Sequence, residues 1–189
     1  MGQIRAWFDG DDRTVADSPA VDSTGRDPLS APNFVAGLRP IPTEVGDPAA
    51  QPAGWTTPDI VGSSPAGDAI SLRIDEVGGV VLVAFLATKC DGCDAFWQGF
   101  GGDDHPGLPP GVTSVIVTRG PGTVAPVEVG RLAADVGSPV IMTDEAWTDY
   151  RVFGYPFFVL VDSPTRTVIA ETVGFGWSDL VRLVQRAVG

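Results

Sequence analysis

The chain has 189 residues, of which 43% are hydrophobic, so its length and composition suit one domain with a packed core. Its net charge of −12 argues against nucleic acid or an anionic membrane surface as a partner, because like charges repel. No stretch approaches the roughly 20 apolar residues of a membrane span, and the first residues lack the apolar core of a signal peptide.

Residues 1–57 differ in composition from the rest of the chain. Prolines recur there among Asp, Ser, Thr and Gly with no sustained periodicity, at Pro19, Pro28, Pro32, Pro40, Pro42, Pro48 and Pro52. Such a segment buries little apolar surface. We therefore expect a flexible, Pro-rich N-terminal arm or linker over 1–57 and a globular domain over 58–189.

The first half of the globular part alternates predicted strands with a predicted helix. Residues 69–74 alternate apolar and polar side chains, which indicates a half-exposed strand. Residues 80–86 are continuously apolar, as expected for a strand covered on both faces. A short helix follows over 93–100 and ends at Gly101-Gly102, and residues 112–118 are a second strand of the buried type.

The second half continues this alternation and closes with a hairpin and a helix. We expect a helix over 127–136, a short strand over 139–142 and a helix through Tyr150 that Asp144 caps. Two strands, 157–161 and 167–173, flank a turn, and Ser178 caps a last helix over 179–188. This order predicts an α/β fold with a mixed sheet.

The only two cysteines, Cys90 and Cys93, lie between the strand over 80–86 and the helix after it. A disulfide framework would need more cysteines at wider spacing, and His105 is the only histidine for a zinc site, so redox use is favoured and no metal is expected. The free N–H groups and dipole of a helix's first turn favour the thiolate of Cys90 as the nucleophile. Cys93, deeper in the helix, would then resolve the mixed disulfide.

Three segments carry a resemblance to a known superfamily. The sequence VVLVAFLATKCDGCDAFWQGF at 80–100 resembles the active-site strand and helix of the thioredoxin superfamily, YPFFVLVD at 155–162 resembles its cis-proline strand, and GFGWSDLVRLVQRAV at 174–188 its terminal glycine and helix. The segment GGVVLVAFLATKC is most similar to the TlpA/ResA/MauD-like redoxin branch, which includes actinobacterial thioredoxin-domain proteins often tethered to membranes. The abundance of Arg over Lys also suits an actinobacterial, GC-rich genome.

The resemblance covers about 58–189 and implies a thioredoxin-like, three-layer α/β/α fold. It also implies that Pro156 is a cis-proline facing the dithiol and that the backbone of Tyr155 holds a substrate chain as an added strand. Lys89 would favour the thiolate of Cys90 and Trp97 could pack beside the dithiol. Asp91 would oppose the thiolate, and the sequence leaves open which charge dominates.

One departure from the superfamily concerns proton transfer. Thioredoxins bury an aspartate six residues before the first cysteine, where it helps to move the proton of the resolving thiol. This chain has Ala84 there. Glu76 or Asp144 could substitute, although each is more consistent with a solvated surface carboxylate.

The resulting hypothesis is a thiol–disulfide oxidoreductase that exchanges electrons with protein disulfides through Cys90 and Cys93. No dissociable cofactor is needed, because the dithiol carries the two electrons, and we expect a monomer. The alternative is a non-enzymatic, thioredoxin-fold binding or assembly module for a client protein. The resemblance favours an extracytoplasmic, membrane-associated location over the cytoplasm, although the chain is soluble as given, and a tether in a longer parent chain stays open.

Overall fold

The computed structural model describes residues 55–101, 107–174 and 176–189. The arm predicted over 1–57 therefore lies outside the described residues up to position 54, as do Gly102 and His105. The strands are β1 (Ile60–Ser63), β2 (Ala69–Leu72), β3 (Val80–Phe85), β4 (Val112–Thr118), β5 (Val140–Met142), β6 (Phe157–Asp162) and β7 (Thr167–Val173). The helices are α2 (Ile74–Val77), α3 (Asp91–Gly99), α4 (Pro126–Leu132), α5 (Glu145–Asp149) and α6 (Trp177–Val188).

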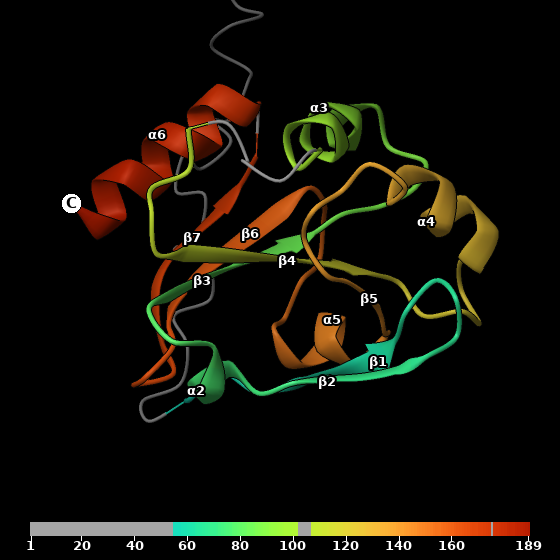
Figure 1. The fold of residues 1–189 in the computed structure, drawn as a ribbon, viewed down its shortest axis with the longest axis horizontal. Helices are drawn as coiled ribbons and strands as arrows, with labels where there is room; N and C mark the ends of the chain where they lie inside the picture. Colours follow the sequence, from blue (N-terminus) through green and yellow to red (C-terminus); the bar gives the residue numbers. More distant parts are fainter. Residues whose placement is uncertain (1–54, 102–106, 175) are drawn as a thin grey trace, which may run out of the picture. The chain divides into compact units, whose positions relative to one another are not determined.

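In the described residues the strands form one seven-stranded mixed sheet in the order β2-β1-β5-β4-β3-β6-β7 (Figure 1). β3, β4 and β5 run parallel, whereas β6 is antiparallel to β3 and β7 is antiparallel to β6. β3 is thus a central strand, paired with β4 on one side and β6 on the other. This is the mixed sheet that the order of predicted elements indicated.

Helices cover both faces of the sheet, which gives three layers. Alternate side chains of β3 point to opposite faces, so Leu82 and Ala84 join a buried cluster with residues of α3, α4 and α6, such as Phe96. Val83 and Phe85 join a second buried cluster with residues of α2 and α5. Because both faces are covered, β3 can be apolar at every position, and the predicted three-layer α/β/α arrangement is confirmed.

The structure corrects several predicted boundaries. Two short elements, β1 and α2, were not predicted, and Ile74 begins α2 instead of ending a strand. α3 begins at Asp91 with Cys90 as its N-cap, α4 ends at Leu132, and α6 begins at Trp177 after Gly176, so Ser178 is not its cap. Asp144 is the N-cap residue of α5 but makes no side-chain capping bond; its carboxylate accepts a hydrogen bond from Thr123 Oγ1 at 2.9 Å.

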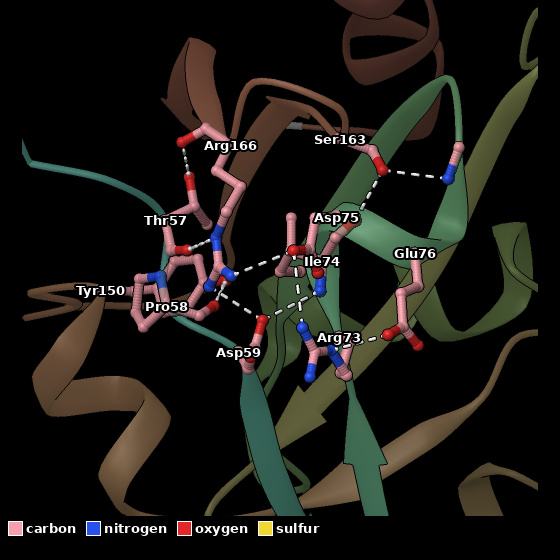
Figure 2. Close-up of polar contacts among 11 residues, drawn as sticks. Thr57, Pro58, Asp59, Arg73, Ile74, Asp75, Glu76, Tyr150, Ser163 and Arg166 are labelled. Carbon is pink, nitrogen blue, oxygen red and sulfur yellow. Dashed lines mark hydrogen bonds and ion pairs between the residues drawn. The ribbon is translucent and has the colours of Figure 1, made fainter.

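A polar network fixes residues 57–59 to the end of the sheet at which β3 begins (Figure 2). Thr57 N–H donates to Arg166 O at 2.9 Å and Arg166 Nε donates to Thr57 O at 2.9 Å. Arg166 also pairs with Asp59 at 2.8 Å, and Tyr150 Oη donates to Pro58 O at 2.8 Å. Thr57 is fully buried, so this segment packs as part of the domain.

Candidate active site: the Cys90–Cys93 dithiol

The two cysteines lie at the junction that the sequence predicted, between β3 and the first turn of α3. Cys90 is the N-cap residue in an extended conformation, and Cys93 N–H donates to Cys90 O at 2.9 Å, which closes the first turn. Cys90 is partly exposed, whereas Cys93 is fully buried, and both are free thiols. One sulfur is therefore accessible to a partner, and the other is reached only through the first.

The environment of Cys93 strongly favours its protonated form. Its side chain belongs to the apolar cluster that contains Leu82, Ala84 and Phe96. Burial, with a smaller contribution from the neighbouring Cys90 thiol, raises the pKa of the Cys93 thiol to about 12. Ala87 N–H donates to Cys93 Sγ at 3.5 Å and acts in the opposite direction, because a hydrogen bond to sulfur stabilises the thiolate.

Pro156 lies beside the dithiol although it is distant in sequence. The Tyr155–Pro156 peptide bond is cis. A Cβ added at Gly92 would lie 3.5 Å from Pro156 Cδ and 3.8 Å from Cys90 Sγ, so the proline and the exposed thiol flank the same glycine. The side chain of Tyr155 is 48% exposed and meets the ring of Trp147 edge-on, with 6.0 Å between ring centroids.

Lys89 is next to Cys90 in sequence, but its ammonium group has a different partner in this structure. Lys89 Nζ pairs with Glu128 Oε1 of α4 at 3.3 Å, and the lysine side chain is 81% exposed. Asp91 and Asp94 occupy the first turn of α3, where their negative charges interact favourably with the positive end of the helix dipole. The charges around the dithiol are thus mixed, with a paired lysine and two carboxylates.

No carboxylate replaces the aspartate that thioredoxins bury, as far as the described residues show. Ala84 is fully buried in the cluster around Cys93. Glu76 pairs with Arg73 at 2.9 Å, and Asp144 accepts from Thr123 and lies 3.7 Å from Arg119. Both carboxylates have other partners and exposed side chains, 68% for Glu76 and 42% for Asp144, which agrees with their interpretation as surface groups.

Trp97 packs beside the dithiol from the second turn of α3. It is 4% exposed, and its Nε1–H donates to Ala87 O at 3.2 Å. Its ring also lines a hollow of about 550 Å³ onto which Cys90 opens, together with Lys89, Asp94 and Arg131.

A second groove, of about 460 Å³, runs from Tyr155 to the first turn of α4. Its lining residues include Ala87, Lys89, Arg119, Val124 and Glu128. Sequence reasoning did not identify Arg119, whose guanidinium lies 4.3 Å from the centroid of the Trp147 ring. The contact joins two elements that are distant in sequence, so no local pattern indicates it.

Sequence reasoning also missed Phe153, three residues before Pro156. It is 94% exposed although the adjoining Val152 is buried, so the loop that leads to Pro156 presents an aromatic ring to solvent. The local signal was present, since a large apolar residue stands next to Gly154 in a loop that ends at a proline.

The described residues contain no group of three or more His, Cys, Asp or Glu side chains placed to hold a metal ion. Among them, no helix has the length and apolar character needed to cross a membrane. The two free thiols of Cys90 and Cys93 are the nucleophilic groups that this site presents.

Solved structures with the same arrangement of elements come from several organisms. A thiol:disulfide interchange protein of the thioredoxin family from Chlorobium tepidum has a TM-score of 0.55 and 21% identity, covering 71% of this chain and 96% of its own. A secreted Mycobacterium tuberculosis disulfide oxidoreductase, homologous to DsbE of E. coli, has a TM-score of 0.54 and 15% identity, covering 67% and 95%.

StoA from Bacillus subtilis has a TM-score of 0.52 and 16% identity, covering 66% of this chain and 95% of its own. No protein-family model matches the sequence, and no curated protein matches it. At these identities the likeness is one of fold, so the chain has the thioredoxin-like fold, and its structural neighbours include thiol–disulfide oxidoreductases.

Proposed function

We propose that this chain is a thiol–disulfide oxidoreductase that exchanges electrons with protein disulfides through Cys90 and Cys93. The observation that carries the proposal is the placing of one accessible and one buried thiol at the start of α3, with Pro156 across Gly92 from Cys90. The thioredoxin-like fold and the activities that its structural neighbours are named for give further support.

In the reducing direction, the Cys90 thiolate attacks one sulfur of a client disulfide. A bond forms between Cys90 Sγ and that sulfur, and the other client sulfur leaves as a thiolate that takes up a proton. Cys93, as the thiolate, then attacks Cys90 Sγ, the mixed disulfide breaks, and the second client sulfur leaves. The client gains two electrons and two protons, and the protein ends with a Cys90–Cys93 disulfide; the oxidising direction is the reverse.

The hollows beside Cys90 and Tyr155 suggest how a client is held. An extended client segment that runs past Pro156 can pair with the backbone of Tyr155 as an added strand, with its side chains in the groove lined by Arg119 and Glu128. The exposed ring of Phe153 gives this segment an apolar contact. The substrate class proposed is therefore a polypeptide with an accessible disulfide.

The first experiment is to measure the reduction potential of the Cys90–Cys93 pair by equilibration against glutathione with mass-spectrometric trapping. We expect a two-electron equilibrium, with a value near about −270 mV for a reductase or nearer about −120 mV for an oxidant. Failure to equilibrate would contradict the enzyme proposal and favour the alternative of a non-enzymatic binding module. The alanine at position 84, where thioredoxins have a buried aspartate, is consistent with that alternative.

The second experiment traps the intermediate. Cys93→Ser should accumulate disulfide-linked complexes with clients, because Cys90 still attacks and nothing resolves the product. The matched control is Cys90→Ser, in which the remaining thiol is buried and should form no such complexes. Complexes that depend on neither cysteine would instead indicate a non-covalent binding module.

A further inference from the structure

Two hydrogen bonds through Ala87 connect Trp97 to the buried thiol. Trp97 Nε1–H donates to Ala87 O at 3.2 Å, and Ala87 N–H donates to Cys93 Sγ at 3.5 Å. Ala87 lies between β3 and α3, where the chain is neither strand nor helix. Because Trp97 is 4% exposed, its bond to the Ala87 carbonyl is largely shielded from competing water.

The Ala87 N–H matters for the charge on Cys93 Sγ because the other groups described around this sulfur are apolar or negatively charged. Cys93 belongs to a buried cluster of apolar side chains. At the position where thioredoxins bury an aspartate, this chain has the buried methyl group of Ala84. The nearby carboxylate of Asp94 disfavours negative charge on Cys93. The Ala87 N–H, which donates to Sγ, therefore stabilises negative charge on this sulfur.

We infer that Trp97 is a positioning residue for the resolving step, since by fixing Ala87 it keeps the Ala87 N–H directed at Cys93 Sγ while negative charge develops there. The inference rests on the proposed function, because it concerns the second half of the same exchange. Trp97 lines the hollow onto which Cys90 opens, but in this scheme it is not one of the reacting groups. It acts through the segment that links β3 to α3.

The step in question begins from the mixed disulfide between Cys90 and a client thiol. The Cys93 thiol gives its proton to solvent, its Sγ forms a bond to Cys90 Sγ, and the bond from Cys90 Sγ to the client sulfur breaks. The electron pair of that bond leaves with the client sulfur, which takes up a proton. Because the step starts from the protonated Cys93 thiol, its transition state carries negative charge on Sγ that the starting state lacks, so a donor there lowers the barrier to this step and not to the attack by Cys90.

The test uses Trp97→Phe, which keeps an aromatic ring and removes the indole N–H. Reduced protein is mixed with one equivalent of dithiobis(nitrobenzoate), and the coloured thiolate is followed by stopped flow. Attack by Cys90 releases the first thiolate and resolution by Cys93 releases the second, so the two steps appear as separate phases. We expect an unchanged first phase and a second phase slower by about fivefold, as for the loss of one hydrogen bond.

Trp147→Phe is the matched control, because it makes the same chemical change at a buried tryptophan whose Nε1 has no hydrogen-bond partner among the described residues. Both of its phases should match the wild type. If Trp97→Phe does not fold, replacing the amide of Ala87 by an ester, with lactate in place of alanine, removes the donor itself. That variant should show the same selective loss.

The outcomes separate the two proposals. A second phase at the wild-type rate in Trp97→Phe, or equal slowing of both phases, overturns the positioning role and leaves the oxidoreductase proposal intact. A wild-type protein that gives no first phase overturns the oxidoreductase proposal itself. Selective slowing in Trp97→Phe with normal phases in Trp147→Phe supports both.

Discussion

Phe153 is a large apolar residue that makes little contact with the rest of the domain. Its ring is 94% exposed, whereas Val152 on one side is buried and Pro156 on the other lies against Gly92. Burying a phenylalanine on binding contributes roughly 2 kcal/mol, so an exposed ring in the loop before Pro156 suits a contact with a polypeptide client. A small disulfide that reaches Cys90 alone does not need this contact.

Phe153→Ser should therefore lower kcat/KM for a protein disulfide by about tenfold and leave the rate with a small aromatic disulfide unchanged. Thermal stability should move little, because the ring contributes little to the core. Val61→Ser is the control, since Val61 is also an exposed apolar residue, at 61%, but lies on β1 and not in the loop that leads to Pro156. Equal losses for both substrates would contradict a docking role.

The residues of the dithiol could be predicted individually because their signals are local. Cys90 and Cys93 come soon after the apolar strand β3, and Pro156 immediately precedes the apolar strand β6. The partners of Lys89 and Trp97 could not be predicted, since Glu128 lies on α4 and the acceptor of Trp97 is a backbone carbonyl whose direction depends on the folded loop. Local sequence identifies which side chains are present, but tertiary packing decides what they contact.

At the level of elements, α3 and α6 approach closely at one glycine. A Cβ added at Gly99 would overlap the ring of Trp177 on α6, and Phe100 meets the same ring edge-on with 4.9 Å between centroids. The small residue thus sets the spacing between the helix that begins at the dithiol and the last helix of the chain.

Gly99→Ala should lower the free energy of unfolding by about 1–3 kcal/mol, because the added methyl group must displace the indole. Gly130→Ala is the matched control on α4, where the new Cβ would meet only Pro65 Cβ at 3.6 Å, an ordinary contact. It should be neutral or stabilising by up to about 1 kcal/mol through helix propensity. Urea unfolding of both variants measures the difference; a neutral Gly99→Ala would show that the helices separate easily.

The strength of the local hydrophobic pattern decided which elements the sequence could predict. The long apolar strands β3, β4 and β6 were found, as was the amphipathic α6. β1 contains a glycine and only four residues, and α2 has four residues with no side-chain cap. Such short elements depend on tertiary partners, here the pairing of β1 with β2 and the buried side chain of Ile74, and so carry little pattern of their own.

For the whole molecule, buried acidic groups predict a loss of stability in alkali. Burial raises the pKa of Cys93 from its ordinary value of 9.0 to about 12, and burial also raises the pKa of Tyr150. At pH values between 9.0 and about 12, the unfolded chain releases the Cys93 proton while the folded chain retains it. Stability is therefore complete below about pH 9 and falls by up to about 1.4 kcal/mol per pH unit as the pH rises towards 12.

The measurement is urea unfolding of the fully reduced protein at a series of pH values above neutrality, compared with reduced Cys93→Ala. The variant lacks the contribution of Cys93, so its stability should fall less steeply above pH 9. Tyr150→Phe separates the contribution of the tyrosine in the same way. If the wild type and Cys93→Ala gave parallel curves, the proton on Cys93 would not be coupled to folding.

The network around Arg166 determines which contacts a force on the start of the described domain reaches first. It fixes residues 57–59 beside the turn between β6 and β7, and Asp162 of that hairpin pairs with Val80 at the start of β3, whereas the dithiol follows the end of β3. The length of that strand, about 20 Å, separates the two places. A pulling force applied at residue 57 would therefore act first on the bonds that Arg166 makes with Thr57 and Asp59. The loop that carries the thiols, at the other end of β3, would keep its geometry while those bonds carry the force.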